Sequence, residues 1–258
     1  MMESREIYSP FLIMEAFEYL LIPDVHCREF WKEPVKEVLE TTNKPIIFFG
    51  DYVDGYPKEF EDESYIKRGI ANLEEIVELK KKYKNRIILL LGNHDCGYAI
   101  EPRICSSRQD KDNYNKISKL FKDNRELFQI AIDFELDDKH IVCSHAGISL
   151  NYIEQFLIKQ LDPVKQLNNA WLTNNEEVLQ SLGVYSHYRG WCGYDFGSPI
   201  WADIREFIID DIEPYGDITI CGHSQVKVGP FISGNIIDID SREAYILTSN
   251  CKVDKYEL

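Results

Sequence analysis

Short apolar runs separated by polar residues recur along this 258-residue chain and predict an α/β protein. The runs 46–49 and 87–91 are apolar on both faces, which favours buried strands. Between them, residues 59–83 carry apolar side chains at near-helical spacing. A strand, a helix and a strand in this order form a βαβ unit, normally part of a mostly parallel sheet. The apolar runs that we expect to form strands are 17–23, 45–49, 86–91, 140–143, 218–221 and 235–239.

The remaining pattern predicts three more helical stretches and one long loop. We expect helices over 114–128, over 149–159, and over 162–182 with an interruption near Asn174. Residues 185–199 are rich in glycine and aromatic side chains, which is typical of a long loop, and 218–247 is expected to be rich in strands. The length suits one domain, and no repeat or linker divides the chain, so we expect a single domain over 1–258.

Polar side chains follow five of the predicted strands directly. In open α/β sheets, ligands bind beyond the carboxyl ends of the strands, so these ends can offer carboxylates and imidazoles to one cleft. Each motif alone is a weak signal, and a lone histidine at a strand end is usually structural. The repeated placement is what favours a shared site. The five ends read Pro23-Asp24-Val25-His26, Gly50-Asp51-Tyr52-Val53-Asp54, Gly92-Asn93-His94-Asp95, Ser144-His145-Ala146-Gly147 and Gly222-His223-Ser224.

This mixture of side chains is suited to binding metal ions. Aspartate supplies hard anionic oxygen, histidine supplies borderline nitrogen, and asparagine supplies a neutral oxygen, a set that suits manganese, iron or zinc. Glycines precede three of the candidates and let the backbone approach the ions closely. The candidate metal ligands are Asp24, His26, Asp51, Asn93, His145 and His223.

Charge and cysteine content narrow the classes of partner and compartment. The chain has 29 basic and 44 acidic residues, a formal net charge of -15, so general nucleic-acid binding is not expected. Bound metal ions can still reverse the field inside a cleft and admit a phosphorylated substrate. Seven cysteines without a disulfide-type framework favour a reducing, cytoplasmic location. The first residues do not read as a signal peptide, and no apolar run is long enough to predict a membrane span.

The five strand-end motifs resemble those of the calcineurin-like metallophosphoesterases. The resemblance is to the branch that contains the serine/threonine phosphoprotein phosphatases and the diadenosine tetraphosphate hydrolases, because His223 stands before Gln225-Val226 without a second histidine. The stretch 198–203 resembles the one that follows the phosphate-binding arginine of the phosphatases, and Arg189 lies where that arginine is expected. The implied fold is α/β in four layers, a central β-sandwich flanked by helices.

The resemblance also implies a role for each candidate. One metal ion would be held by Asp24, His26 and Asp51, and a second by Asp51, Asn93, His145 and His223. His94 would be the general acid, paired with Asp54, and Arg189 would bind the phosphate.

Several positions depart from the family pattern. Pro23 and Cys27 stand where glycines are usual, and Asp95 stands where glutamate is usual. The usual Asp-Arg-Gly is Asp54-Gly55-Tyr56, so one of the two arginines that grip phosphate is missing. This loss puts protein phosphatase specificity in question.

These observations predict hydrolysis of phosphomonoesters by water activated between two metal ions, with a phosphoprotein or a small molecule as the substrate. The alternative is a hydrolase of dinucleoside polyphosphates or other nucleotides, which the missing arginine and the aromatic loop keep open. The third alternative, a non-catalytic binding protein on the same fold, is less favoured because the ligand set and the pair His94–Asp54 are complete.

Overall fold

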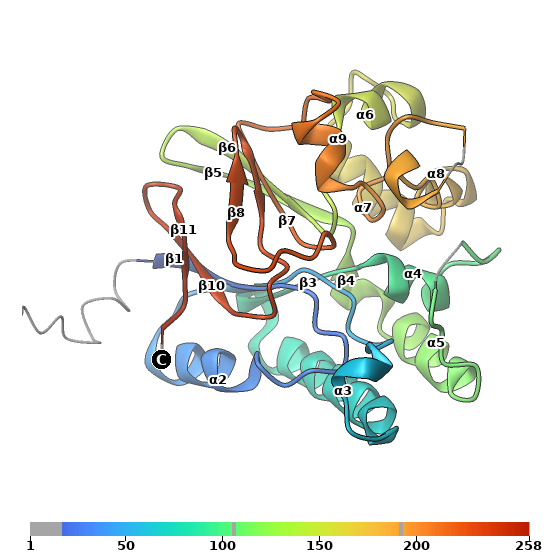
Figure 1. Ribbon diagram of the computed structural model, residues 1–258, viewed down its shortest axis with the longest axis vertical. Helices are drawn as coiled ribbons and strands as arrows, with labels where there is room; N and C mark the ends of the chain where they lie inside the picture. The colour runs from blue at the N-terminus through green and yellow to red at the C-terminus, as the bar shows by residue number, and fades with distance from the viewer. Residues whose placement is uncertain (1–16, 105–106, 191–192, 258) are drawn as a thin grey trace, which may run out of the picture.

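The strands of the computed structural model, which describes residues 17–104, 107–190 and 193–257, form two sheets (Figure 1). In the six-stranded sheet the order is β11-β10-β1-β2-β3-β4, and β1 to β4 are parallel. In the five-stranded sheet the order is β5-β6-β7-β9-β8, with β6, β7 and β9 parallel. The bounds are β1 Phe17–Ile22, β2 Ile46–Phe48, β3 Ile87–Leu90, β4 Phe128–Gln129, β5 Ala131–Leu136, β6 Lys139–Ser144, β7 Ile218–Cys221, β8 Phe231–Ser233, β9 Ile236–Asp238, β10 Tyr245–Thr248 and β11 Val253–Lys255.

The two sheets pack face to face, which explains why the central strands are apolar on both sides. Leu21, Ile47 and Leu90 of the first sheet share a buried cluster with Ile141 and Ile220 of the second. Their neighbours along each strand point the other way, since side chains alternate between the two faces of a strand. The mixed α/β fold with two sheets and helices is therefore as expected, whereas the βαβ pattern alone predicted only one parallel sheet.

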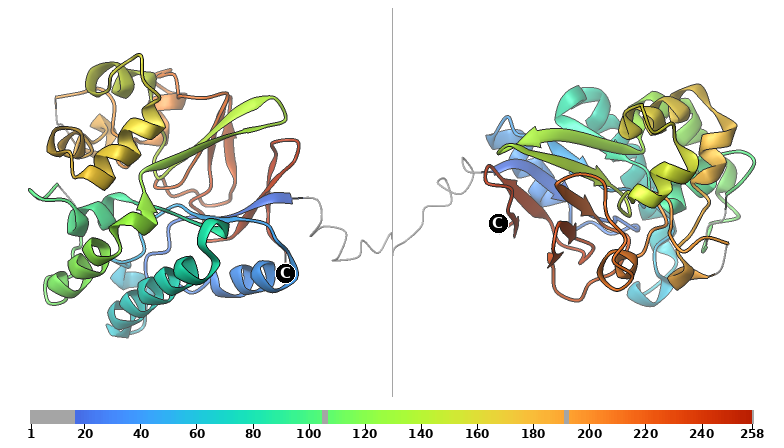
Figure 2. Two further views of the ribbon diagram at one scale, coloured as in Figure 1. Left: turned by 180° about the vertical axis from the view of Figure 1, so that it is seen from behind. Right: turned by 90° about the horizontal axis from the view of Figure 1, so that it is seen from above.

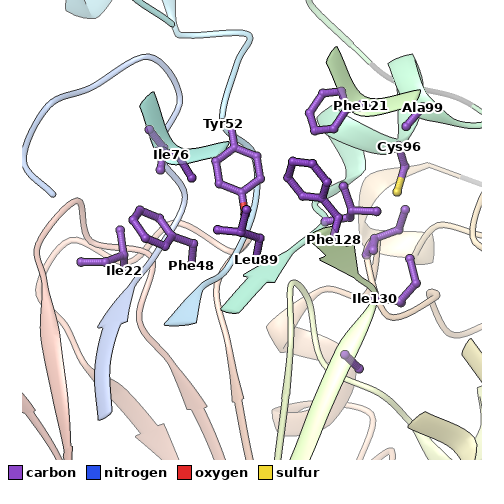
Figure 3. Close-up of a cluster of buried hydrophobic side chains, with 14 of the residues drawn as sticks. Ile22, Phe48, Tyr52, Ile76, Leu89, Cys96, Ala99, Phe121, Phe128 and Ile130 are labelled. Atoms are coloured by element: carbon purple, nitrogen blue, oxygen red, sulfur yellow. The ribbon is translucent and has the colours of Figure 1, made fainter. Parts of the chain in front are cut away.

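Helices cover the outer face of the six-stranded sheet (Figures 1 and 2). Ile22, Phe48 and Leu89 pack there against Ile76 of α3 and Phe121 of α5 (Figure 3). The helices of this layer are α2 Lys32–Thr41, α3 Ser64–Tyr83 and α5 Tyr114–Asp123, and the short helix α4 Asn93–Ala99 follows β3 directly.

A second group of helices gathers at one end of the five-stranded sheet (Figure 1). Phe207 of α9 packs with Cys221 and Ile236 on the outer face of that sheet. The helices are α6 Leu150–Phe156, α7 Pro163–Thr173, α8 Glu176–Ser181 and α9 Ile204–Ile208. Single 3-10 turns are η1 Pro57–Glu59, η2 Lys84–Arg86, η3 Arg125–Leu127 and η4 His187–Arg189. No helix in the described ranges combines the length and apolar character that crossing a membrane requires.

Two of the predicted helices differ from the observed ones in extent. The stretch 59–83 becomes helical only at Ser64, after η1. The stretch 114–128 leaves the helix after Asp123, because Phe128 pairs with Leu89 at the edge of the six-stranded sheet. The predicted interruption at Asn174 is confirmed, since this residue has a left-handed φ of 54° and separates α7 from α8.

Candidate metal centre

The six predicted metal ligands come together where strand ends of both sheets meet. Asp24, His26 and Asp51 follow β1 and β2, Asn93 opens α4 after β3, and His145 and His223 follow β6 and β7. All six side chains are buried. Two sets of side chains have ligand atoms within 4.8 Å of one another, and Asp51 belongs to both; the sets are Asp24, Asp51, His145 and His223, and His26, Asp51 and His94.

Nε2 of His145 lies close to three other candidate ligand atoms. His145 Nε2 lies 3.0 Å from His223 Nδ1, 3.1 Å from Asn93 Oδ1 and 3.5 Å from Asp51 Oδ2. The other nitrogen, His145 Nδ1, is 2.7 Å from the carbonyl oxygen of Phe49. Because a carbonyl only accepts, Nδ1 carries the proton and Nε2 presents its lone pair to three other lone-pair donors.

His26 repeats this arrangement in the second set. Its Nδ1 donates to the carbonyl oxygen of Val53 at 3.0 Å, which leaves Nε2, 3.2 Å from Asp51 Oδ2, as a lone-pair donor. Burial lowers the pKa of His26. Burial also lowers the pKa of His223, and the nearby charge of Arg189 adds to this effect. The imidazoles are therefore held neutral, the state in which they bind metal ions.

A buried aspartate and an unpaired histidine nitrogen also suit the binding of cations. Burial raises the pKa of Asp24 well above its usual value, and the negative charge of Asp51 raises it further. His223 Nε2 is buried and has no hydrogen-bond partner among the described residues. Carboxylates and lone pairs that converge without a donor between them repel one another, and cations would offset that repulsion. The residues present thus fit a cation-binding centre around Asp51.

The backbone around the ligands is strained in a way that the strand ends alone did not predict. His26, Asp51 and His223 have φ of 42°, 51° and 68°, in the left-handed region that costs about 1 to 2 kcal/mol for such residues. Gly92 allows the close approach, because a Cβ atom there would collide with the carboxylate of Asp51. Such strain is found where the surrounding structure holds side chains for function.

His94 and Asp54 form the predicted pair. His94 Nδ1 lies 2.8 Å from Asp54 Oδ2, and both side chains are buried. The other carboxylate oxygen, Asp54 Oδ1, accepts a hydrogen bond of 2.6 Å from the hydroxyl of Tyr98. His94 also donates its backbone N–H to Asp51 Oδ1 at 3.0 Å, so its position is tied to the metal ligands.

Arg189 lies beside the ligand His223. Its Nη2 donates to Ser224 Oγ at 3.0 Å and to the carbonyl oxygen of His223 at 3.3 Å. Its Nε pairs with Asp203 Oδ2 at 3.1 Å, and Asp203 also holds Arg205. The two arginines keep the pKa of Asp203 below its usual value although burial opposes this. Asp203 thus fixes the guanidinium of Arg189 next to His223, a candidate metal ligand.

The sequence model of the calcineurin-like phosphoesterases matches residues 17–227, which is most of the chain and spans all the residues above. The chain belongs to this family. Its members are metal-dependent hydrolases, which agrees with the converging ligands.

Solved structures agree with the fold. One is a cold-active protein-tyrosine phosphatase from the psychrophile Shewanella sp., with 14% identity, a TM-score of 0.57, and coverage of 94% of this chain and 81% of that one. A second structure described as a cold-active protein tyrosine phosphatase has 14% identity, a TM-score of 0.54, and coverage of 93% and 78%. At this identity the likeness concerns the arrangement of the elements.

The structure explains how the chain accommodates two of the departures from the family pattern. Cys27 keeps a left-handed φ of 64°, so the chain retains at this position the conformation that glycine adopts most easily. Asp95 accepts hydrogen bonds from the backbone N–H groups of Asp51 at 2.7 Å, Tyr52 at 3.0 Å and Gly92 at 2.9 Å. It therefore joins the loops after β2 and β3. This function was missed in the sequence, although an acid near the start of a helix is a typical capping signal.

The cysteines near the site are structural. Burial raises the pKa of Cys27 to about 12, and it also raises the pKa of Cys96, Cys143 and Cys221. Reactive cysteines are exposed thiolates, so these features favour a packing role over redox control.

The aromatic residues of the loop 185–199 mostly pack within the protein. Tyr194 and Phe196 lie against Phe156 of α6, with ring centroids 5.2 Å and 6.4 Å away. Trp201 contacts the ring of His223 edge-on at 5.5 Å, and Trp191 lies outside the described residues. Tyr194 and Phe196 are thus engaged with α6, which gives little support to a base-stacking role for these two rings.

Proposed function

We propose that this phosphoesterase hydrolyses phosphomonoesters with two metal ions bound around Asp51. The observation that carries the proposal is the convergence of His145 Nε2, His223 Nδ1 and Asn93 Oδ1 beside Asp51, next to the hydrogen-bonded pair His94–Asp54. Neutral nitrogen donors and carboxylates at one place serve metal binding, and an adjacent imidazole with a carboxylate partner serves proton transfer.

The ligands divide into two groups that share Asp51. Asp24, His26 and Asp51 would hold one ion, since His26 Nε2 lies 3.9 Å from Asp24 Oδ2 and 3.2 Å from Asp51 Oδ2. Asp51, Asn93, His145 and His223 would hold the other. Asp24 also lies beside His145 and His223. Manganese, iron and zinc all suit this mixture of nitrogen and oxygen atoms. When bound, a metal pair supplies Lewis acidity and a nucleophilic water at neutral pH.

The remaining steps belong to side chains of the protein. His94 gives a proton from Nε2 to the leaving oxygen, because its Nδ1 is held by Asp54. Asp54 orients the ring through this hydrogen bond. Arg189, anchored by Asp203, binds non-bridging phosphoryl oxygens, which match the fork of a guanidinium.

A substrate panel tests the proposal. Purified protein is assayed with manganese, zinc, iron and magnesium on an aryl phosphate, a phosphoserine peptide, a phosphotyrosine peptide and a dinucleoside tetraphosphate. We expect release of inorganic phosphate from the monoesters that is abolished by chelation and restored by at least one metal. Turnover of the dinucleoside tetraphosphate alone would instead favour the nucleotide hydrolase. Tight metal binding without turnover of any substrate would favour a binding protein.

We also propose that the protein works in a reducing compartment. Five cysteines of the described ranges are free and buried, namely Cys27, Cys96, Cys143, Cys221 and Cys251. Free thiols support a reducing location such as the cytoplasm.

A further inference from the structure

The position that carries the second phosphate-binding arginine in related enzymes is glycine here, and a side chain at this position would displace its neighbours. A Cβ atom at Gly55 would lie 2.9 Å from the rings of Phe60 and Tyr65 and 3.1 Å from the carbonyl oxygen of His26. Contacts this close require the neighbours to shift. Replacing Gly55 by a larger residue would therefore disturb the packing of the loop after β2. A second anion-binding group has to come from elsewhere in the chain.

Arg108 places a guanidinium beside His94 from a different part of the chain. Arg108 Nη2 donates to His94 Nε2 at 3.0 Å, the ring nitrogen on the side away from Asp54. Its Cζ lies 3.9 Å from the centre of the Tyr56 ring, a cation–π contact that holds the plane of the group. Tyr56 itself lies edge-on to the ring of the metal ligand candidate His26, with centroids 5.0 Å apart.

Two other arginines of the described residues, Arg28 and Arg242, are paired with one carboxylate. Arg28 donates from Nε and Nη2 to Glu59 Oε2, at 2.9 Å and 2.7 Å. Arg242 pairs with the other oxygen of Glu59. Arg108, by contrast, has no carboxylate partner within ion-pair distance among the residues that the structure describes. Its positive charge is therefore available to an anion.

The loop that carries Arg108 is anchored to the catalytic pair. Gln109 donates to the carbonyl oxygen of Gly97 in α4 at 2.7 Å. The backbone N–H of Asp110 donates to the hydroxyl of Tyr98 at 2.6 Å, and this hydroxyl donates to Asp54 Oδ1. The same hydrogen-bond network therefore positions Arg108, Asp54 and His94.

We propose that Arg108 is the second phosphate-binding residue of this enzyme. It exchanges its hydrogen bond to His94 Nε2 for bonds to non-bridging phosphoryl oxygens. Nε2, which accepts from Arg108 in this structure, then takes up a proton from water and can donate it to the leaving oxygen. A cavity of about 160 Å³ lined by Cys27, Asp54, Gly55 and Arg108 gives the side chain room to move. Arg108 and Arg189 then grip the phosphoryl group from the His94 side and the His223 side. This inference rests on the proposed function, and it assigns to Arg108 the role of the phosphate-binding arginine that is missing at Gly55.

The test compares Arg108→Ala and Arg108→Lys with Arg103→Ala. Arg103 is a matched control, because it belongs to the same connection after α4 and its guanidinium stacks 3.7 Å above the ring of Tyr114, away from His94. We measure kcat/KM on an aryl phosphate, the inhibition constant of inorganic phosphate, bound metal and the far-UV spectrum. Charge-assisted hydrogen bonds of this kind account for about ten- to hundredfold in binding.

We expect Arg108→Ala to raise the inhibition constant of phosphate and to lower kcat/KM by about ten- to hundredfold each, with unchanged metal content. Arg108→Lys recovers part of the loss, because it restores the charge but not the fork. Arg103→Ala stays within about twofold. An Arg108→Ala protein that keeps wild-type phosphate inhibition and kcat/KM overturns the inference even if the wild type is an active phosphatase.

If the wild-type protein turns over no monoester, the proposed function fails and Arg108 is judged by binding alone. Calorimetric titration of the manganese-loaded protein with inorganic phosphate then compares wild type and Arg108→Ala. A weaker affinity in the variant supports the inference, and equal affinity or no binding in both proteins overturns it.

Discussion

His94 has different partners at its two ring nitrogens, and its proposed chemistry depends on that difference. Asp54 holds Nδ1 at 2.8 Å, and Arg108 approaches Nε2 at 3.0 Å. A carboxylate at Nδ1 fixes the orientation of the ring, while a movable cation at Nε2 can give way to the leaving group. The residue thus combines a rigid side and a side open to substrate, as an acid catalyst requires.

Replacement of His94 tests this role. We expect His94→Asn to lower kcat about 10²- to 10⁴-fold on an alkyl phosphate, whose leaving group needs a proton, and less on an aryl phosphate. Metal content should not change, because none of the six proposed ligands is altered. Steady-state kinetics and metal analysis check both points.

The control is His140→Asn. His140 Nε2 pairs with Asp133 at 2.9 Å on the five-stranded sheet, so it is also a histidine with a carboxylate partner, but it lies outside the two metal-ligand groups. Wild-type turnover of the alkyl phosphate by His94→Asn, or an equal loss in His140→Asn, would contradict the assignment.

Helix α3 fixes the turn that carries the first two candidate ligands. Gly69 lies on the buried side of this helix, and a Cβ atom there would collide with the Sγ atom of Cys27, one residue after His26. The absence of a side chain lets the helix approach the strained turn after β1. The element therefore acts on the site through packing, without contributing a ligand.

Gly69→Ala should destabilise the protein. In an ordinary helix interior, alanine is favoured over glycine by about 1 kcal/mol, but overpacking costs about 1 to 3 kcal/mol. We expect a net loss of up to about 2 kcal/mol in the free energy of unfolding, measured by urea denaturation. In a Cys27→Ala background the loss should shrink, because the sulfur is gone. A Gly69→Ala protein more stable than wild type would refute this packing argument.

At the scale of the whole molecule, the site exists only where the two sheets meet. Asp24 of the six-stranded sheet accepts a hydrogen bond of 3.1 Å from the backbone of His223, which follows β7 of the five-stranded sheet. The candidate ligands are buried and repel one another in the absence of cations. Metal binding should therefore stabilise the complete fold, and not only a local loop.

Manganese should raise the melting temperature of the wild-type protein. A ligand that binds only the folded state adds about 2.7 kcal/mol at a free concentration of 100 times Kd. Differential scanning calorimetry with and without manganese measures the shift. Asp51→Asn should lose most of it, because Asp51 belongs to both ligand groups.

Asp133→Asn, which alters a half-buried carboxylate outside those groups, is the control and should keep the shift. Equal shifts in wild type and Asp51→Asn would mean that manganese binds elsewhere.

The hydrophobic pattern predicted the central strands because burial on both faces demands continuous apolar runs. It did not predict α2 or β5, although both carry a signal: Val35, Val38 and Leu39 lie at helical spacing, and residues 132–136 alternate between apolar and acidic side chains. Helix α4 has no such signal, because its residues 93–99 are buried on all sides. The predicted end of the helix over 114–128 was wrong, because Phe128 pairs with β3 and this pairing overrides the local helix propensity.

The sequence alone determined the ligand types and their order, since a metal centre requires carboxylates, imidazoles and an amide where strands end. Only the tertiary structure decided how they combine. It placed His223 next to Asp24, although the two residues are 199 positions apart in the chain. It also set the tautomers of His26 and His145 through hydrogen bonds to backbone carbonyl oxygens. It also brought Arg108 to His94, for which no local pattern exists. Spacing along a chain fixes what residues can do, but distances between elements depend on how their buried faces pack.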